Sequence, residues 1–554
     1  MEVDRRAAEG REPLLCRHAA WLLVCFAYLF VFPYFERINN PNENVRVWMT
    51  RAIVEHHVLN IDQVTREWGY VNDKATTGGH LFSSKAPGTS FLGVPVLWVQ
   101  TQLHHLARQP SPNKREATLW LRVFSVELPM CLFLFFFARY VERVTRSTTA
   151  RDLLVVGLGA GTLLYPYGVI FVGHAQAAAL AFAGYMLLAW DKLGAGVAGG
   201  GRGGGGTGVG AIPEPAGAWY PRAQTGDRRA PATATLVWAG ALTALAVVFE
   251  YQALLVCAAV AAYAVQRHRR RAAAFFAGAG AVAALLGLYH TVLFGRPWRF
   301  PYAYLENPEF LRHHHSAGFH GLALPKLGAM SSALFSPDYG LFVFSPVLAL
   351  GLLCAVAVTV WGEKLEGALI LVVTAVMVLF LGGMTNWRAG WCVGPRYIAT
   401  VAPFLIAGIA HAWRLVRARF ALSVSAAGLI LVSVLLNAVS AAVYPHYPTD
   451  FDNPVFDLAF PLLGAGFVPY SLGWLVLPGL WSLAPLAAAL LLALSLGAAG
   501  EDWRPARWAL HGALAVLIAV AFLLPLSRYG RAPNPGEARA AAFVRSTWEP
   551  RPAP

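Results

Sequence analysis

Apolar stretches of about 20 residues recur along almost the whole sequence, and they constrain the fold more than any other feature. A helix that rises about 1.5 Å per residue needs roughly this length to cross a hydrocarbon core about 30 Å thick. Hydrophobic residues make up 57% of the chain and charged residues 13%, and the mean hydropathy is +0.50. The sequence therefore predicts an all-α polytopic membrane protein with about 13 transmembrane helices.

The formal net charge is +14, and the arginines cluster in short loops between the apolar stretches. Arginine-rich short loops mark the cytoplasmic side of a membrane protein, so this charge does not indicate a nucleic-acid partner. The six cysteines form no CxxC pair and indicate neither a disulfide framework nor a zinc site. The first apolar stretch, residues 18–35, is too long for a signal-peptide core and predicts a retained first span.

The arginine clusters also predict the topology. The N-terminus (1–17), RHRRR (267–271) and RLVRAR (414–419) are expected in the cytoplasm. The segments then expected outside are 36–85, 295–340, 385–396, 444–473 and the tail 528–554. Two arrangements with the same total of spans fit the region between. Either 86–106 crosses the membrane and 234–266 is one long helix, or 86–106 lies at the interface and 234–266 is a hairpin with Glu250 at its outer turn. We favour the hairpin because it places the arginines of 139–152 inside.

The predicted organisation follows from these spans. Residues 18–191 hold the first spans and the first outer loop (36–85), 233–413 complete the core, and 414–527 hold the last spans. The segment 192–232 includes GAGVAGGGRGGGG, which cannot bury enough apolar surface to offset its ordering entropy. We expect a disordered cytoplasmic linker there.

The segment RINNPNENVRVWMTRAIVEHH predicts a helix in the first outer loop. Asn40 suits the N-cap, Pro41 the first helical position and Glu43 the third, as in a capping box. One face of this helix is apolar and the other polar: Val45, Trp48, Met49, Ala52 and Ile53 against Arg46, Thr50, Arg51 and Glu55. Such a helix beside a span is expected to lie in the interface plane. The sequence allows Glu43 to be a cap or a catalytic acid.

The stretch GHLFSSKAPG (79–88) places His80 and Lys85 where apolar sequence begins, after Asp62 and Asp73 in the same loop. A lysine in this position commonly reaches for the lipid headgroups. It is equally suited to bind the phosphate of a lipid-linked substrate.

Taken in order, these motifs resemble the GT-C superfamily of membrane glycosyltransferases, most of all the bacterial relatives of protein mannosyltransferases and of lipid A aminoarabinose transferases. The resemblance covers most of residues 18–410. It rests on one span followed by an outer loop that begins with an acid in NENVR and continues through Asp73 and GHLFSSKAPG. Four later segments contribute: GTLLYPYGVIFVGHAQAA (161–178), FEYQALL (249–255), FSPDYGLFVFSPVL (335–348) and NWRAGWCVGPRYIATVAPFL (386–405).

The resemblance implies a polyprenyl-phosphate-sugar donor, an active site at the outer (periplasmic) face of a bacterial-type inner membrane, and transfer with inversion. It implies that an acid of the first outer loop acts as base or binds a divalent metal, Mg²⁺ or Mn²⁺, and Glu43 matches this position. Many members carry a second acid after the third span, where this sequence offers His174.

Transfer from such a donor needs a base for the acceptor hydroxyl and cations for the departing phosphate. Glu43 and Asp73 are the catalytic candidates, and Lys85 and Arg396, in VGPRY, are expected to hold the phosphate. Glu250 lies between two apolar runs, and an acid in such a position is expected to have a functional role. The substrate-binding candidates are Arg46, His80, Lys85, His174, Glu250, Tyr251, Trp391, Arg396 and Tyr397.

Two further patterns have ordinary interpretations. RHHHSAGFH (312–320) does not predict a zinc site, because adjacent histidines do not readily converge on one ion. An interfacial aromatic belt is favoured over sugar stacking for Trp387, Trp391, Tyr397, Tyr444 and Tyr447. Trp391, beside GPRY, is the first of them to test for stacking.

The expected acceptor is a lipid, a polysaccharide or a protein. Two other functions stay open. A flippase or transporter of lipid-linked sugars would also span the membrane, but the spans show no two-half repeat of the kind that many transporters carry. A catalytically inactive scaffold of the same fold is suggested by the missing second carboxylate.

Overall fold

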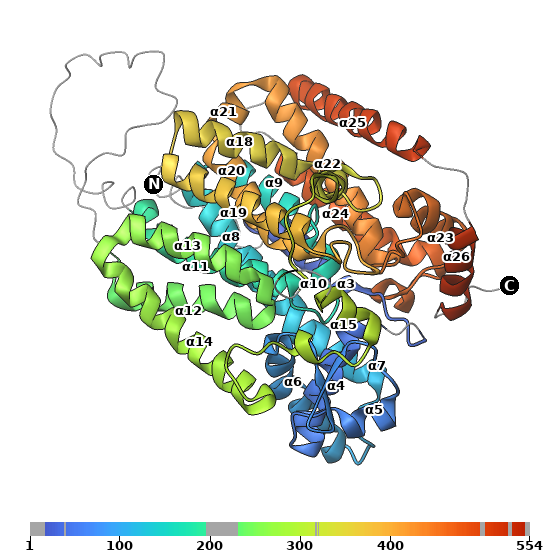
Figure 1. Cartoon of the computed structure of the whole chain (residues 1–554). Coiled ribbons are helices and arrows are strands. Elements are labelled where there is room, and N and C mark those ends of the chain that lie inside the picture. Colours follow the sequence, from blue (N-terminus) through green and yellow to red (C-terminus); the bar gives the residue numbers. More distant parts are fainter. Residues whose placement is uncertain are drawn as a thin grey trace, which may run out of the picture.

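The computed structural model describes residues 17–37, 40–194, 231–315, 318, 321–498, 505–529 and 535–548 (Figure 1). Most of the predicted linker falls outside these residues. The longer α-helices are α3 (Ala19–Phe30), α4 (Pro41–His56), α6 (Gly88–Leu106), α7 (Lys114–Arg122), α8 (Leu128–Thr145), α9 (Thr148–Gly159), α11 (His174–Gly194), α12 (Thr233–Phe249), α13 (Leu254–His268), α14 (Ala272–Phe294), α15 (Pro308–His315), α16 (Leu327–Phe335), α18 (Val347–Trp361), α19 (Lys364–Gly383), α20 (Ala402–His411), α22 (Phe420–Ala442), α24 (Ala484–Ala498), α25 (Pro505–Arg528) and α26 (Pro535–Thr547).

Strands play a small part in the described residues. They form two antiparallel pairs, β1 (Val31–Phe32) with β4 (Tyr470–Ser471) and β2 (Lys74–Thr77) with β3 (His80–Ser83). The all-α prediction is confirmed.

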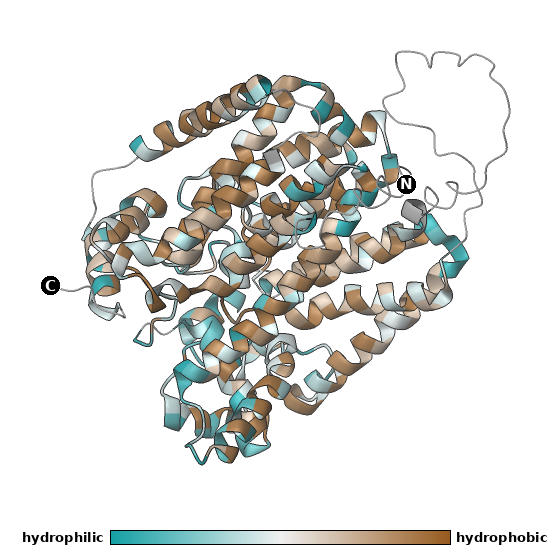
Figure 2. Ribbon diagram, turned by 180° about the vertical axis from the view of Figure 1, so that it is seen from behind, coloured by the Kyte–Doolittle hydropathy of each residue, from teal (hydrophilic) through white to brown (hydrophobic). Residues whose placement is uncertain are grey.

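Six described helical segments are long and apolar enough, by length and composition, to cross a membrane. They are Lys114–Thr145, Tyr251–Phe294, Lys364–Gly383, Phe420–Ala442, Gly479–Gly497 and Pro505–Arg528. Shorter apolar helices cover other predicted spans, among them Ala19–Phe30 and Val347–Trp361. Figure 2 shows hydrophobic residues along these helices, whereas hydrophilic residues gather on the lobe that contains α4 and α5 (Asp62–Trp68).

The apolar run 234–266 is the predicted hairpin. Helix α12 ends at Phe249, the backbone of the next residue, Glu250, is extended (φ −148°, ψ 118°), and α13 begins after a 3₁₀ turn. Helix α12 packs between α11 and α14. Helix α6 lies with α4, α5 and α7 at the lower end of Figure 1, away from α18 and α22. The interfacial position of 86–106 stays a prediction.

Helix α4 begins as predicted and is buried further than predicted. The Asn40 side chain accepts a hydrogen bond from the backbone N–H of Glu43 at 3.4 Å, and Pro41 opens the first turn. The polar face is buried as well as the apolar one, because α4 packs against α5, α6 and α7. Arg46 and Thr50 are both fully buried. A helix covered on all sides presents its charged side chains to the protein interior.

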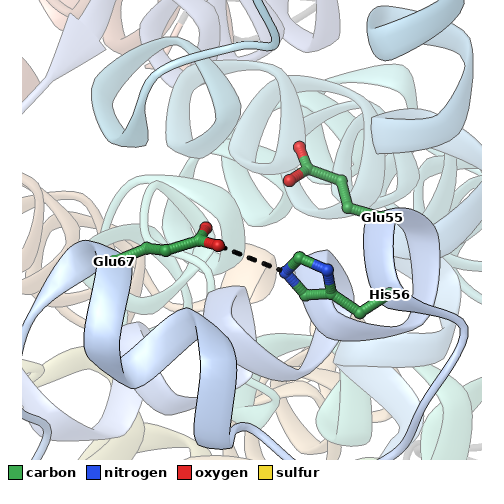
Figure 3. A group of neighbouring side chains, drawn as sticks. All are labelled: Glu55, His56 and Glu67. Carbon is green, nitrogen blue, oxygen red and sulfur yellow. Dashed lines mark ion pairs between the residues drawn. The ribbon is translucent and has the colours of Figure 1, made fainter.

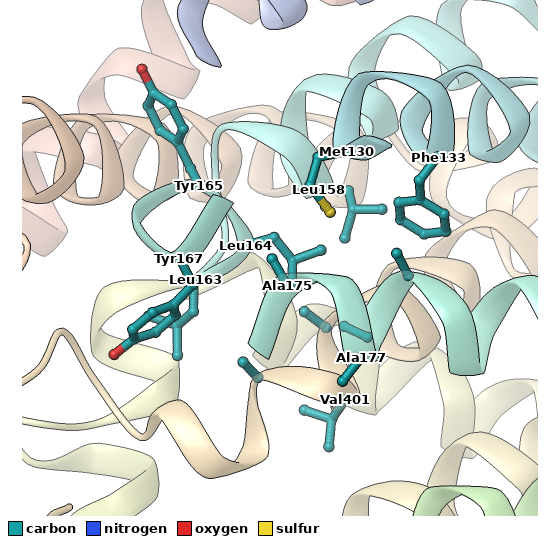
Figure 4. Close-up of a cluster of buried hydrophobic side chains, with 14 of the residues drawn as sticks. Met130, Phe133, Leu158, Leu163, Leu164, Tyr165, Tyr167, Ala175, Ala177 and Val401 are labelled. Atoms are coloured by element: carbon teal, nitrogen blue, oxygen red, sulfur yellow. The ribbon is translucent and has the colours of Figure 1, made fainter. Parts of the chain in front are cut away.

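The turn YPYG is fixed in the core beside the outer segments (Figure 4). Tyr165 donates a hydrogen bond to the carbonyl of Ala27 at 2.9 Å, and Tyr167 donates to that of Val393 at 2.6 Å. A Cβ atom at Gly168 would meet the Tyr28 ring at 2.4 Å, so only glycine allows this approach. The turn thereby ties the start of α11 to α3 and to the segment before Arg396.

Candidate active site

The segments predicted to lie outside converge on one polar pocket of about 450 Å³. The first outer loop, the segment 295–340, the segment around 385–397 and the segment 444–473 all line it. The lining side chains include Asn40, Asn42, Asn72, Asp73, Lys85, Tyr302, Phe310, His314, Asn386, Trp391, Arg396, Tyr397, His446 and Thr449. Five predicted site residues, Asp73, Lys85, Trp391, Arg396 and Tyr397, are therefore brought together.

Asp73 and Lys85 form a buried ion pair in this pocket. The Lys85 Nζ lies 2.5 Å from Asp73 Oδ2, and Ser84 Oγ donates a hydrogen bond to Asp73 Oδ1 at 3.1 Å. Burial raises the pKa of Asp73, but the Lys85 and Arg396 charges and the hydrogen bonds from Lys85 and Ser84 together outweigh it and hold the pKa below its ordinary value. Burial and the neighbouring Arg396 and Arg46 charges lower the pKa of Lys85 more than Asp73 raises it. Each charge is thus stabilised by its partner.

A β-hairpin creates this ion pair. Lys74 pairs with Ser83 and Thr77 with His80, and the turn between them is Gly78–Gly79, with φ of +57° and +81°. The register places Asp73 and Lys85 just beyond the open end of the hairpin. An ion pair between Lys74 and Glu306 joins the hairpin to the segment 295–340.

Arg396 is the second cation of the pocket. It forms no ion pair with any acid in the part of the chain that the structure describes, and its buried Nε has no hydrogen-bond partner there. Its guanidinium lies 5.5 Å from the centre of the Tyr397 ring. Because Asp73 is matched by Lys85, the charged lining residues carry one positive charge in excess, which favours an anionic ligand.

Three predicted substrate residues form a buried cluster next to the pocket. Arg46 Nη2 lies 2.7 Å from Glu250 Oε1, and His174 Nδ1 lies 3.5 Å from the same oxygen. Arg46 Nη1 also donates to the backbone oxygen of Asn42, a lining residue, at 2.9 Å. A Cβ atom at Gly173 would meet the carbonyl oxygen of Phe249 at 2.4 Å, so this glycine permits the approach of α11 to α12. The cluster therefore supports the pocket lining at Asn42.

Glu43 lies apart from the pocket lining. Its carboxylate accepts hydrogen bonds from Arg122 Nε at 2.7 Å and Nη2 at 2.8 Å, and from the backbone N–H of Phe171 at 2.7 Å. Burial raises the pKa of Glu43, but the Arg122 charge and these hydrogen bonds outweigh it and lower the pKa. A divalent ion would have to displace the guanidinium, so the residues present at Glu43 do not fit one. Dependence on Mg²⁺ or Mn²⁺ stays a prediction.

Other predicted residues also have positions outside the pocket. His80 is exposed, with its Nδ1 2.6 Å from Asp62 Oδ2, and the Tyr251 hydroxyl lies 2.9 Å from His290 Nε2. The aromatic belt is wrong for Tyr444 and Tyr447, which are 0% and 2% exposed because the segment 444–473 folds inward. The run 312–320 contributes His314, which stacks on Tyr302 at 4.6 Å and lines the pocket, whereas His320 lies outside the described residues.

Glu55, His56 and Glu67 are the described group that best matches a set of metal ligands (Figure 3). Their potential ligand atoms lie within 4.8 Å of one another. Arg51, however, pairs with Glu55 at 2.7 Å and with Glu67 at 2.6 Å, and its guanidinium lies 4.0 Å above the Trp68 ring. This arginine already supplies the positive charge that the two carboxylates need, so we interpret the group as an ion-pair network.

The sequence prediction missed several residues that shape the site. Arg122 lies inside a predicted span, and a charged residue there was itself a signal of function or pairing. His446 and Tyr302 have no such signal, because only the fold brings their segments to the pocket. Burial lowers the pKa of His446 to about 4, so its ring is neutral at pH 7.

An apolar groove of about 930 Å³ begins beside the polar pocket. Side chains of α6, α8, α11, α12 and α14 line it, and Leu132, Phe136 and Leu285 on its rim are exposed. The groove starts at Pro87, whereas the polar pocket includes Lys85. Because Lys85 and Pro87 are two positions apart in the chain, their Cα atoms are at most about 7.6 Å apart.

No protein-family model and no curated protein matches the sequence. The chain is similar in structure to ArnT from Cupriavidus metallidurans bound to undecaprenyl phosphate, with 12% identity and a TM-score of 0.44 over 96% of this chain and 79% of that one. It is also similar to the apo oligosaccharyltransferase of Archaeoglobus fulgidus, with 12% identity and a TM-score of 0.37 over 89% of this chain and 57% of that one.

Proposed function

We propose that this protein is an integral-membrane glycosyltransferase that transfers a sugar, with inversion, from a polyprenyl-phosphate donor to an acceptor at the outer face. The observation that carries the proposal is the junction of the two cavities. A pocket with an excess positive charge opens within two residues of an apolar groove between membrane helices. A phosphate attached to a long apolar chain matches both halves of this arrangement.

In the proposed reaction, Lys85 and Arg396 hold the donor phosphate and the polyprenyl chain lies in the groove. The sugar enters the polar pocket, where aromatic and amide side chains such as Trp391 and Asn386 suit its ring and hydroxyls. The acceptor oxygen attacks the anomeric carbon as the bond to the phosphate oxygen breaks. Polyprenyl phosphate leaves with the bonding electrons, and Lys85 and Arg396 stabilise its growing charge. A single displacement of this kind inverts the anomeric centre.

Asp73 is the proposed base, because it is the acid of the first outer loop that lines the pocket. In the free protein the Lys85 ammonium keeps its pKa low. When the ammonium turns to the donor phosphate, the pKa of Asp73 rises and its carboxylate becomes a stronger base for the acceptor proton. The Asp73 carboxylate is therefore a stronger base only when the donor is bound.

The test uses the purified full-length protein in lipid nanodiscs with undecaprenyl-phosphate hexose labelled in the sugar. We expect the label to leave the lipid fraction in the presence of a hydroxyl acceptor, with an equimolar release of undecaprenyl phosphate. Asp73→Asn should lower this rate by about 10²–10⁴-fold, the range for a lost general base. In proteoliposomes, movement of the intact labelled lipid between leaflets without cleavage would instead indicate a transporter, and neither activity would indicate a scaffold.

The groove makes a separate prediction about chain length. Leu245→Trp on α12 narrows the groove, so we expect binding of the C55 undecaprenyl phosphate to weaken at least about tenfold, since each buried CH₂ contributes about 0.8 kcal/mol. Binding of ethyl phosphate, whose two-carbon chain does not occupy the groove, should stay unchanged. Leu517→Trp, at an exposed position of α25, is the matched control. Equal losses for both chain lengths would contradict this use of the groove.

A further inference from the structure

The segment that follows α25 folds back onto the outer part of the protein. Helix α26 ends at Thr547, and Trp548 after it is fully buried. The Trp548 ring packs on Phe35, Phe467 and Tyr444, with ring centres 4.7, 5.6 and 6.0 Å away. Figure 1 shows α26 beside α23 (Phe460–Gly464), away from the long helices of the bundle. An aromatic socket thus fixes the end of this segment.

Each part of that socket belongs to a segment that lines the polar pocket. Phe35 precedes the lining residue Asn40 by five positions, and Tyr444 precedes the lining residue His446 by two. One turn earlier on α26, the Phe543 ring packs at 6.0 Å on Trp391, which lines the pocket directly. Helix α26 and Trp548 therefore contact three segments that form a wall of the pocket, those around Asn40, Trp391 and His446. None of the residues of α26 lines the pocket itself.

These wall segments have little regular structure of their own. The backbone N–H of Cys392 donates to the carbonyl of Tyr447 at 3.0 Å, which joins the segments 386–397 and 444–449 to each other. Asn40 Nδ2 lies 3.4 Å from His446 Nδ1, which joins the first outer loop to the same unit. Phe543 and Trp548 pack their side chains on these three joined segments and do not line the pocket. Irregular segments with few backbone hydrogen bonds open locally unless packing holds them.

We propose that residues 535–548 position the outer wall of the pocket, with Trp548 as the positioning residue. Trp548 touches no reacting group in this scheme and acts through Tyr444 and Phe35 on His446 and Asn40. The wall contains Trp391 and His446 but not Lys85. Its segment 386–397 reaches Arg396, but Arg396 begins a 3₁₀ helix (Arg396–Val401) that packs on α11 and α19. We therefore infer that the segment 535–548 governs the sugar and acceptor side of the pocket, and not the phosphate end. The effect on transfer rests on the proposed function, whereas the effect on the wall does not.

The test compares Trp548→Ala, Trp548→Phe and the control Trp481→Ala, whose ring is 72% exposed. In hydrogen exchange of the full-length protein in nanodiscs, we expect Trp548→Ala to speed exchange at least about tenfold in 386–397 and 444–449. Exchange in the β2–β3 hairpin and binding of undecaprenyl phosphate should stay unchanged. Trp548→Phe should restore most protection, because the indole N–H has no hydrogen-bond partner among the described residues and only packing is at stake.

If the protein transfers sugar, Trp548→Ala should lower kcat/KM for the acceptor at least about tenfold and leave the apparent affinity for the donor lipid unchanged. Unchanged exchange in the two wall segments would overturn the proposal. Faster exchange throughout the protein would also overturn it, because Trp548 would then support the whole fold and not the wall. If the wild type transfers no sugar, the proposed function fails while the exchange result still decides this inference.

Discussion

Lys85→Ala should lower the kcat for sugar transfer by about 10²–10³-fold, the loss typical of one removed group that stabilises the charge of a transition state. The ammonium lies two residues from the groove-lining Pro87, so we expect it to balance, together with Arg396, the charge that grows on the departing phosphate. Binding of undecaprenyl phosphate, measured by calorimetry in detergent, should weaken as well. Lys326→Ala, at an exposed lysine on the edge of α16, should change neither quantity.

The loss of Lys85 also leaves Asp73 buried without its cation, and this can destabilise the protein by about 3–5 kcal/mol. Two further variants separate catalysis from folding. Lys85→Ala combined with Asp73→Asn removes both charges and should recover stability without recovering phosphate binding. Arg396→Ala leaves no described acid unpaired, so it should weaken phosphate binding with little change in thermal stability. Wild-type binding in both Lys85→Ala and Arg396→Ala would rule out the phosphate assignment.

The local features of the site could be predicted from the sequence because short-range chemistry determines them. Asn40 and Pro41 set the start of α4, and the arginines of 267–271 predict that Glu250 faces the other side of the membrane. The same topology placed the four outer segments together, and they do line one pocket. The Gly78–Gly79 turn was a further local signal of the hairpin that pairs Asp73 with Lys85.

The partners of the charged side chains could not be predicted, because tertiary packing chooses them. Arg46 was expected on an exposed polar face, yet it pairs with Glu250, 204 residues away. Glu43 lies at the predicted position near the start of α4. Its partner Arg122, however, lies 79 residues away, and nothing in the sequence around Glu43 indicates this pairing. Periodicity separates an apolar face from a polar one, but it does not say whether the polar face meets water or a buried counter-charge.

Either single variant at the Glu43–Arg122 pair should destabilise the protein by about 3–5 kcal/mol, because each leaves one charge buried without its partner. The exposed fractions of the two side chains are 5% and 1%, so water cannot replace the missing group. We expect Glu43→Gln and Arg122→Met to lower the thermal transition in detergent. Arg17→Met breaks the Arg17–Glu142 pair, whose arginine is 45% exposed, and should cost at most about 1 kcal/mol.

The double variant Glu43→Gln with Arg122→Met distinguishes a structural Glu43 from a catalytic one. A neutral pair removes the unmatched charge, and the amide oxygen introduced by Glu43→Gln can still accept the hydrogen bond from Phe171, so most of the stability should return. If Glu43 is structural, sugar transfer returns with stability, whereas Asp73→Asn stays inactive in the same preparation. A stable but inactive double variant would instead make Glu43 the base. In that case the Arg122 guanidinium would have to leave the carboxylate during each turnover, since Glu43 accepts from it through both oxygens in the structure.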